Sequence, residues 1–237
     1  MPTPRVIDLS HHNTVPSDFE ETKKAGIVGV IHKLTEGSSF VDKKVQARCF
    51  LAREAGMAWG VYHFLRPGNM KEQAKFFLDT GKSLDVIDSG TLLVADHEDE
   101  GVSGQQLKEF LDYLEDATHR SPVIYSGHVL KDQLAGKGYK PKRRLWLCQC
   151  CSPPPKLPEG VDQFWLWQYT DKGSIPGVNS PVDLNDIGTQ DVNDFLQGWA
   201  GAVFPTPKPE PPQEVVVYLT VQATAPPGVT VRVVVEQ

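Results

Sequence analysis

Long apolar runs are missing from this chain: no stretch approaches the roughly 20 residues that a membrane-spanning helix needs. The first residues, MPTPRVIDLS, lack a basic stretch followed by an apolar stretch, so the sequence predicts no secretory signal. An excess of basic residues is also absent, and the formal net charge is −6. Nucleic acids and anionic membranes are therefore not expected as partners. We expect a cytoplasmic protein, unless export uses a route that the sequence does not reveal.

Cysteine is scarce, with four residues in 237. Cys49 lies in a helical pattern, whereas Cys148, Cys150 and Cys151 form one tight cluster. A structural zinc site needs two separated pairs of ligands, and none of the seven histidines belongs to an HExxH motif or to a pair at helical spacing. We therefore expect reduced thiols, no metal and no cofactor. A disulfide or a metal at the cluster is the less favoured alternative.

What the chain does contain is a regular alternation of strand-like and helix-like segments. From RVIDL to HVLKDQLAG, apolar runs alternate with amphipathic segments, which is typical of parallel strands with helices outside. The clearest helix follows Ser103, a suitable N-cap, and its apolar positions share one face: Leu107, Phe110, Leu111 and Leu114. Three short strands with little helix between them come next, in RRLWLCQC, FWLWQYT and SPVDLNDI.

This pattern predicts an α/β fold, namely a modified TIM-like (β/α) barrel. It has five βα units and a helix-poor last part of three strands. An open, doubly wound sheet is the alternative, because it also arises from alternating strands and helices. The two folds differ in one testable respect: only a closed barrel makes the first and last strands neighbours.

The C-terminal part has a different composition from the predicted barrel domain, residues 1–204. Residues 205–212, PTPKPEPP, predict a stiff proline-rich linker. Residues 213–237 hold two β-branched runs around APPG, which predict a small β-hairpin. A lone hairpin is not stable in water, so we expect it to dock on the barrel, to form a homo-oligomer, or to bind a ligand surface.

Polar side chains gather where the predicted strands end, and barrel enzymes place their active sites there. Three strands carry carboxylates at this point: Asp8, then Asp96 with Glu98, then Asp183. Asp8 and Asp183 lie on the first and last strands, so they meet if the barrel is closed. We expect the last strand to run parallel to the others and to end in Asp183, Asn185 and Asp186.

The stretch TLLVADHEDEG holds five charged or titratable residues behind an apolar run. Side chains alternate across a strand, so Asp96 and Glu98 share the inner face and His97 points outward as a structural histidine. Asp99 and Glu100 are expected to be exposed loop residues ahead of the next helix.

Clustered carboxylates suit the cleavage of a glycosidic bond. One acid donates a proton to the leaving oxygen, and a second stabilises positive charge at the anomeric carbon. Aromatic rings stack on sugar faces, and we expect this of Tyr62, Trp165, Trp167 and Tyr169. A single acid after a strand is more often a helix cap or turn residue, and for Trp165 a place in the core is favoured over sugar stacking. Four acids that converge from three strands are less easily explained in that way.

Seven motifs in order along the chain resemble glycoside hydrolase family 25, the Chalaropsis-type lysozymes common among phage endolysins and bacterial or fungal muramidases. These motifs are VIDLSHHN, KLTEG, GVYHFLRP, VADHE, PVIYSG, LWQYT and VDLN. The resemblance implies a modified barrel and hydrolysis of the β-1,4 bond between N-acetylmuramic acid and N-acetylglucosamine in bacterial peptidoglycan. It also fits an enzyme held in the host cytoplasm until lysis.

The resemblance also implies roles for single residues. Glu98 corresponds to the general acid, Asp96 to the carboxylate that assists at the reaction centre, and Asp8 and Asp183 to supporting acids. The residues implied to bind substrate are Lys33, Tyr62, Tyr125, Trp167 and Gln168. His97 departs from the family pattern, in which the middle residue of D-x-E is often aliphatic. The C-terminal segment resembles no wall-binding module of the choline-binding, LysM or SH3 types, although wall binding stays open.

Two other functions compete with hydrolysis of peptidoglycan. The histidines at strand ends, His12, His32 and His63, are compatible with a metal-dependent barrel phosphodiesterase. A non-catalytic barrel that binds cell-wall sugars would use the same aromatic residues without cleaving a bond.

Overall fold

The computed structural model describes residues 5–14, 19–134, 143–150, 155–179, 181–188 and 191–201. The predicted linker and hairpin, at residues 205–212 and 213–237, lie outside the described residues. The strands are β1 (Arg5–Leu9), β2 (Ile27–Glu36), β3 (Phe40–Val41), β4 (Ala58–Phe64), β5 (Leu92–Asp96), β6 (Val123–Ser126), β7 (Leu145–Cys148), β8 (Leu166–Gly173) and β9 (Val182–Ile187). The helices are α1 (Phe19–Lys24), α2 (Val45–Glu54), α3 (Met70–Ser83), α4 (Gly104–Thr118), α5 (His128–Leu134) and α6 (Val192–Gln197).

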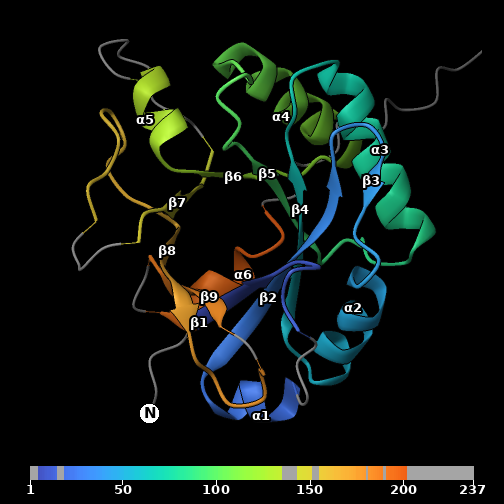
Figure 1. Cartoon of the computed structure of the whole chain (residues 1–237), viewed down its shortest axis with the longest axis vertical. Coiled ribbons are helices and arrows are strands. Elements are labelled where there is room, and N and C mark those ends of the chain that lie inside the picture. The colour runs from blue at the N-terminus through green and yellow to red at the C-terminus, as the bar shows by residue number, and fades with distance from the viewer. Residues whose placement is uncertain are drawn as a thin grey trace, which may run out of the picture. The chain divides into compact units, whose positions relative to one another are not determined.

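The strands close into a barrel (Figure 1). In the described part of the chain the order around it is β1, β2, β4, β5, β6, β7, β8 and β9, and β9 pairs again with β1. The two-residue strand β3 pairs only with the end of β2, at the rim. The predicted barrel is confirmed, and the open doubly wound sheet is wrong.

One strand runs against the prediction. The pairs from β1 through β2, β4, β5, β6 and β7 to β8 are parallel, but β9 is antiparallel to both of its neighbours. The start of β9 therefore lies where the other strands end, which puts Asp183 at the barrel mouth. Asp186 lies at the other end, 3.6 Å from Arg5, so its predicted place at the mouth is wrong.

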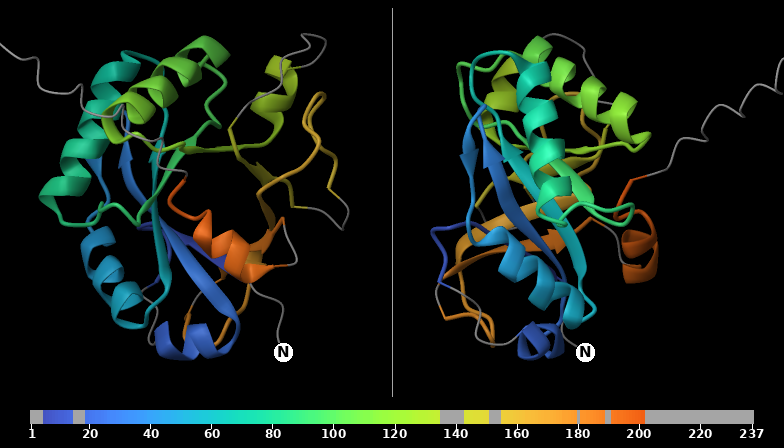
Figure 2. Two further views of the ribbon diagram at one scale, coloured as in Figure 1. Left: turned by 180° about the vertical axis from the view of Figure 1, so that it is seen from behind. Right: turned by 90° about the vertical axis from the view of Figure 1, so that its right-hand side faces the viewer.

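The two longest helices, α3 and α4, pack on the outside of the strands (Figure 2). Asn69 caps α3 by accepting hydrogen bonds from the backbone N–H groups of Lys71 and Glu72. Ser103 caps α4, as predicted, in a capping box with Gln106. The apolar face predicted for α4 is also confirmed, because Leu107, Phe110, Leu111 and Leu114 are all buried.

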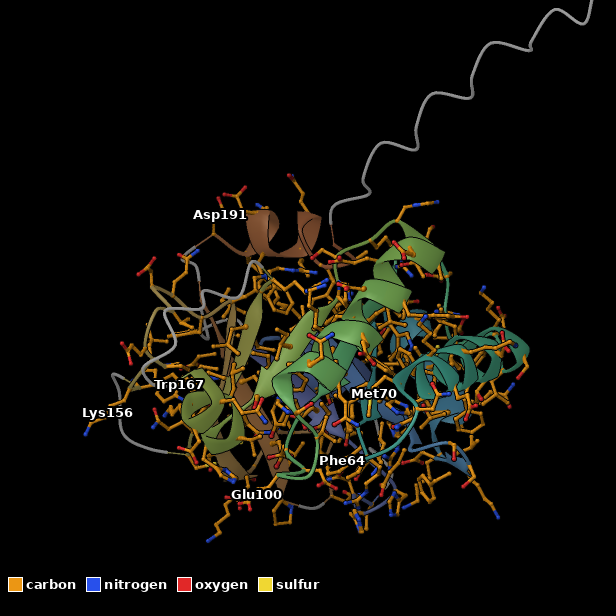
Figure 3. The ribbon with its side chains drawn as sticks, turned by 90° about the horizontal axis from the view of Figure 1, so that it is seen from above. Phe64, Met70, Glu100, Lys156, Trp167 and Asp191 are labelled. Atoms are coloured by element: carbon orange, nitrogen blue, oxygen red, sulfur yellow. The ribbon has the colours of Figure 1, made fainter. Side chains whose placement is uncertain are left out.

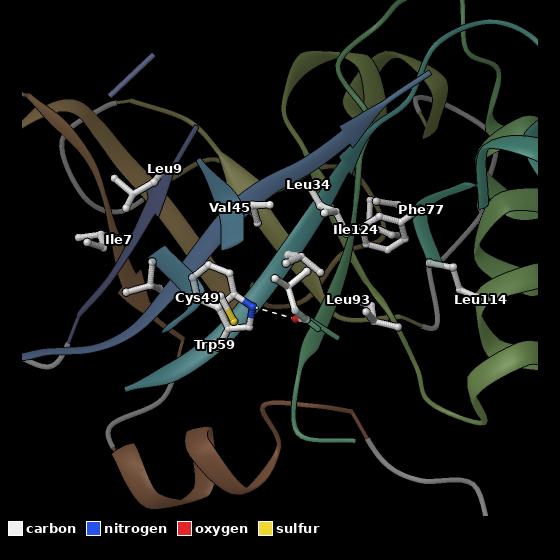
Figure 4. Packing of buried hydrophobic residues seen from close by; sticks show 14 of the residues in the cluster. Ile7, Leu9, Leu34, Val45, Cys49, Trp59, Phe77, Leu93, Leu114 and Ile124 are labelled. Carbon is white, nitrogen blue, oxygen red and sulfur yellow. Dashed lines mark hydrogen bonds between the residues drawn. The ribbon is translucent and has the colours of Figure 1, made fainter. Parts of the chain in front are cut away.

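Strand alternation divides the buried residues between two cores. Side chains inside the barrel form one cluster: Val6, Ile31, Leu92, Val94, Val123, Tyr125, Trp146 and Leu166. Their neighbours along the same strands face outward and pack under the helices in a second cluster, part of which is shown in Figure 4. There the indole N–H of Trp59 donates to the carbonyl of Val86 over 3.0 Å. The same alternation determines which polar side chains point into the barrel mouth.

Aromatic residues fill the end of the barrel opposite the mouth. Phe195 and Trp199, from α6 and the turn after it, join the inner cluster. The indole N–H of Trp199 donates to the carbonyl of Trp59 over 2.7 Å. Its ring lies so close to Gly29 that a Cβ there would be only 2.7 Å from Trp199 Cη2. Bulky side chains are therefore excluded at this position of β2.

Cys49 and Cys148 are free thiols, whereas Cys151 lies outside the described residues. None of the helices in the described part of the chain combines the length and apolar character that crossing a bilayer requires.

Candidate active site

The four predicted carboxylates come from three strands that meet at the barrel mouth. Asp8 on β1 and Asp183 on β9 are directly opposite each other in the strand pairing, as closure of the barrel predicts. Asp96 is the last residue of β5, and Glu98 follows two residues later. The two ends of the barrel lie on opposite sides of the view in Figure 3. Phe64 and Glu100 lie on the mouth side, and Asp191 lies with α6 on the other side.

Asp8 is buried and held by two amides. Its Oδ2 atom accepts hydrogen bonds from Asn185 Nδ2 over 2.9 Å and from Gln168 Nε2 over 3.1 Å. Burial raises the pKa of Asp8 well above its usual value, and the negative charge of Asp183 raises it further. Because both amides donate to Oδ2, we infer that the proton of Asp8 is carried by Oδ1.

Asp183 shares that proton. Burial also raises the pKa of this half-buried carboxyl, while a hydrogen bond from Asp8 opposes the increase. The two carboxyl groups are therefore coupled, and the hydrogen bond between them favours the proton on Asp8 and the negative charge on Asp183. The anion on Asp183 lies on the more open side of the pair, where it also acts on Glu98.

Asp96 is 4% exposed, and its Oδ1 atom has no hydrogen-bond partner among the described residues. Burial raises its pKa well above the usual value, the charge of Glu98 adds to the increase, and the charge of Lys33 opposes it. Buried polar atoms are rarely left unpaired in proteins unless they serve a function. An unpaired carboxylate oxygen at the end of a strand, beside a second acid, marks a place for chemistry.

Glu98 is half-buried beside Asp96. Burial raises its pKa; the charge of Asp183 acts in the same direction, whereas His128 and a hydrogen bond with Cys148 act against it. A carboxylic acid that keeps its proton at higher pH than usual is suited to donate it in a reaction. The site thus brings together coupled carboxyl groups that hold protons at higher pH than usual, and glycosidic bond cleavage uses such a pair of carboxyl groups.

Two tyrosines and a glutamine complete the inner wall of the mouth. The pKa of Tyr62 is raised well above its usual value by burial and by the charges of Asp96 and Asp8. The hydroxyl of Tyr125 donates to Gln168 Oε1 over 2.9 Å, and Gln168 in turn donates to Asp8. All three therefore lie with the acids, where the sequence places them.

Lys33 is a buried cation beside the acids of the mouth. Its Nζ atom donates to Glu36 Oε2 over 2.5 Å and lies over the rings of Phe64, at 5.0 Å, and Phe40, at 5.4 Å. The charge of Lys33 lowers the pKa of Asp96, although burial outweighs it there. Lys33 therefore balances part of the negative charge of the mouth from its rim.

Trp167 faces the other way from Gln168. Adjacent residues on a strand point to opposite faces, and Gln168 is inside while Trp167 belongs to the outer core with 4% exposure. Its indole N–H donates to the carbonyl of Gln149 over 2.8 Å. Trp165 stacks on Phe195 at 4.7 Å, at the closed end of the barrel. The favoured prediction for Trp165, a place in the core, is therefore confirmed over sugar stacking. The packing of Trp167 does not favour its predicted substrate contact, which stays a prediction.

His97 is buried and points outward, as alternation predicts. Its Nε2 atom lies 2.9 Å from the carbonyl of Val102, so this nitrogen carries the proton. Burial lowers its pKa, and the ring is neutral near pH 7. The residue fixes the loop after β5 and with it the position of Glu98.

Two residues of the mouth were not assigned a role from the sequence. Asn185 donates to Asp8 and accepts from Trp146 Nε1 over 2.6 Å. The sequence contains a signal for Asn185, because this residue lies two positions from Asp183 and its side chain is on the same face of the strand. The Sγ atom of Cys148 lies 3.4 Å from Gln168 Oε1, and this thiol also interacts with Glu98. The sequence offers no comparable signal for Cys148, because a thiol in an apolar strand is typical of a core.

Two of the three histidines proposed for a metal-dependent reaction, His32 and His63, have their ring nitrogens engaged elsewhere. The ring nitrogens of His32 contact Lys33 O over 2.7 Å and Arg48 NH1 over 2.8 Å. Those of His63 contact Thr35 Oγ1 over 2.7 Å and Gln73 Oε1 over 3.1 Å. Both rings lie on outer strand faces with all their nitrogens engaged, and therefore neither ring offers a nitrogen to a metal at the mouth.

Comparison with known proteins agrees with this geometry. The model of the family described as glycosyl hydrolases family 25 matches residues 7–178. The uncharacterized protein YegX of Escherichia coli is 32% identical over 184 residues, which make up 74% of this chain and 64% of YegX. Lysozyme M1 of Streptomyces globisporus is 28% identical over 194 residues, or 76% of this chain and 66% of that protein. This chain thus spans just under two thirds of the length of each relative.

The barrel also matches a solved structure over nearly its whole length. The bacterial lysozyme from Streptomyces coelicolor superimposes with a TM-score of 0.73 and 26% sequence identity, covering 84% of this chain and 98% of that chain. The similarity therefore extends over the entire described barrel.

Proposed function

Because the chain belongs to glycosyl hydrolase family 25, we propose that it is a peptidoglycan hydrolase of the muramidase type. It would cleave the β-1,4 bond between N-acetylmuramic acid and N-acetylglucosamine. The observation that carries this proposal is the convergence of four carboxyl groups at one barrel mouth, each with a raised pKa. Bringing such a group of acids together lowers the stability of the folded state, and it is typical of sites that move protons.

In the proposed reaction Glu98 donates its proton to the oxygen of the leaving sugar. Asp96 carries the unpaired oxygen and acts at the anomeric carbon, either on the positive charge that develops there or through the acetamido group of the substrate. Water then completes hydrolysis, and Glu98, now ionised, accepts its proton. The raised pKa of Glu98 is compatible with its role as the donor, and the family motif assigns this role to Glu98 rather than to Asp96, whose pKa is also raised.

The other mouth residues support these two. The pair of Asp8 and Asp183 supplies one negative charge, which keeps Glu98 protonated and favours a positive charge in the transition state. Tyr62, Tyr125 and Gln168 are proposed to contact the sugars, and Lys33 to set the charge balance at the rim. The proposed substrate is the glycan strand of the bacterial cell wall.

We further propose an endolysin-like setting, in which the protein stays in the cytoplasm of a host cell until lysis. Residues 1–204 would form the catalytic domain, with residues 205–212 as linker. Self-association through residues 213–237 stays a prediction, because these residues lie outside the described part of the chain.

The test compares Glu98→Gln with the wild type on purified cell walls, by new reducing ends and by the muropeptides released. Glu100→Gln is the matched control, since Glu100 is exposed in the same loop and contacts only His128 among the interactions described, at 3.5 Å. We expect Glu98→Gln to lose about two to four orders of magnitude in kcat and Glu100→Gln to stay near the wild type. Products that end in reducing N-acetylglucosamine, or full activity of Glu98→Gln, would contradict the proposal.

A further inference from the structure

A second cavity opens beside the catalytic mouth. It has a volume of about 350 Å³ and lies between the turn that joins β2 to β3 and the loop that joins β4 to α3. Its lining includes Glu36, Ser39, Phe40, Arg66, Asn69 and Glu72. Both segments follow the carboxyl ends of barrel strands, so the cavity lies on the same side of the barrel as the four acids.

A chain of contacts joins this cavity to the catalytic mouth. Lys33, whose charge acts on Asp96, donates to Glu36 Oε2. The other oxygen of Glu36 accepts hydrogen bonds from Arg66 NH2 over 2.7 Å and Nε over 2.9 Å. The Lys33–Glu36 ion pair therefore links the catalytic mouth to the wall of the cavity.

The lining carries charges of both signs. Arg66 provides a half-exposed guanidinium, which also binds Glu36 and Asp99. The start of α3 provides the positive end of a 14-residue helix, and Glu72 is an exposed carboxylate. Phe40 adds an apolar surface that is 39% exposed. Charges of both signs beside an apolar ring suit a ligand that itself carries charged groups of both signs and a small apolar group.

We propose that this cavity binds the peptide stem of peptidoglycan. The stem is attached through the lactyl group to each N-acetylmuramic acid, so one stem always lies next to the bond that would be cleaved. It carries free carboxylates and an ammonium group on its diamino acid, which match Arg66 and Glu72, and an alanine methyl that matches Phe40. The inference rests on the proposed function and extends it from the glycan strand to the peptide.

Its first test compares two substrates: intact peptidoglycan, and the same glycan strands after an amidase has removed the stems. Ser39→Trp fills the cavity from an exposed turn, and Ser83→Trp places the same ring at the exposed far end of α3 as a matched control. We expect wild type and Ser83→Trp to prefer the stem-bearing strands by about tenfold in kcat/KM, or about 1.4 kcal/mol. Ser39→Trp is expected to lose this preference and to keep its rate on stem-free strands.

The second test measures binding without catalysis. A soluble stem tripeptide is titrated into each protein and followed by NMR shifts of the backbone amides around Ser39 and Asn69. Binding to the wild type and Ser83→Trp, but not to Ser39→Trp, supports the proposal. Glu72→Gln provides a smaller change that leaves the turn intact, and it is expected to weaken binding of the tripeptide.

The outcomes separate this inference from the function on which it rests. Equal losses of Ser39→Trp on both substrates would show that the cavity holds sugar and would overturn the inference. Cleavage with no preference for stems, and no tripeptide binding, would overturn it as well while leaving the muramidase proposal intact. A wild type that binds the tripeptide but releases no reducing ends would refute the muramidase activity and retain the peptide site.

Discussion

The barrel mouth holds two groups of carboxylates whose environments are opposite. The inner group is Asp8, Asp96, Glu98 and Asp183. The rim group is Glu36 and Asp99, which both bind the guanidinium of Arg66. Hydrogen bonding to Arg66 lowers the pKa of Asp99. Burial acts to raise the pKa of Glu36, but hydrogen bonds from Lys33 and Arg66 outweigh it and lower the pKa.

The difference shows how one stretch of chain makes acids of two kinds. Asp96 and Asp99 are three residues apart, yet the pKa of the first is raised and that of the second is lowered. Burial without a cation in direct contact favours the neutral acid, and an arginine at hydrogen-bonding distance favours the anion. The rim acids hold loops in place, and the inner acids store protons for the proposed reaction.

The largest expected contrast comes from removing one acid of each kind. Asp96→Asn removes a carboxylate at the proposed reaction centre, so we expect kcat to fall by about two to four orders of magnitude. Asp99→Asn removes one surface contact with Arg66, which is worth roughly 0–1 kcal/mol in stability, and we expect activity near the wild type. The release of reducing ends from purified cell walls measures the activity of both variants. Equal losses in the two variants would remove the distinction between the groups.

The next contrast is a shift in pH dependence. Ionised Asp183 raises the pKa of Glu98, so Asp183→Asn is expected to lower that pKa. Glu98 must be protonated to act as the donor, and the basic limb of the kcat/KM profile should therefore move to lower pH. Asp186→Asn, on the same strand at the closed end, is the control and should leave the limb in place. A basic limb that moves upward in Asp183→Asn would refute this coupling.

A smaller effect is expected on stability, from Asp8. The folded state raises the pKa of Asp8, so it binds this proton more tightly than the unfolded chain, whose Asp pKa is about 3.9. Stability is therefore lost as the pH rises from the unfolded pKa to the folded pKa, and the cost persists above it. Asp8→Asn resembles the protonated acid and can still accept from both amides.

We thus expect Asp8→Asn to raise Tm at pH 7, by roughly 2–4 °C for each kcal/mol recovered. At pH 3 both states of the wild type are largely protonated at this position, and the gain should nearly vanish. Calorimetry at the two pH values provides the measurement, with Asp79→Asn in an exposed ion pair as control. A variant that is less stable than the wild type at pH 7 would contradict the proton assignment.

Much of the site follows from the sequence by alternation and closure alone. The positions of Asp96, Glu98 and His97 needed only the two-residue period of a strand, and the meeting of Asp8 with Asp183 needed only a closed barrel. These features depend on local geometry and on the identity of neighbouring strands, which a sequence pattern can carry.

The features that the sequence did not predict depend on the direction of a strand and on which side chains of a strand face the interior of the barrel. The antiparallel course of β9 moved Asp186 to the closed end, and no periodicity encodes the direction of a strand. Trp167 and Gln168 were assigned together, although neighbours on a strand cannot both face inward. The sequence predicts no role for Asn185 or Cys148, because an amide and a thiol gain their importance only from the partners that the fold provides.

The smallest expected effect tests Cys148, the neighbour of Glu98 on the inner face. Its hydrogen bond lowers the pKa of Glu98, so Cys148→Val should raise that pKa and move the basic limb of the kcat/KM profile to higher pH. This shift is opposite in sign to that of Asp183→Asn and smaller. Cys148→Ser retains a donor of similar size and should restore the wild-type profile. If valine and serine give the same profile, Cys148 only fills space, and the proton balance of the mouth is set by its carboxylates alone.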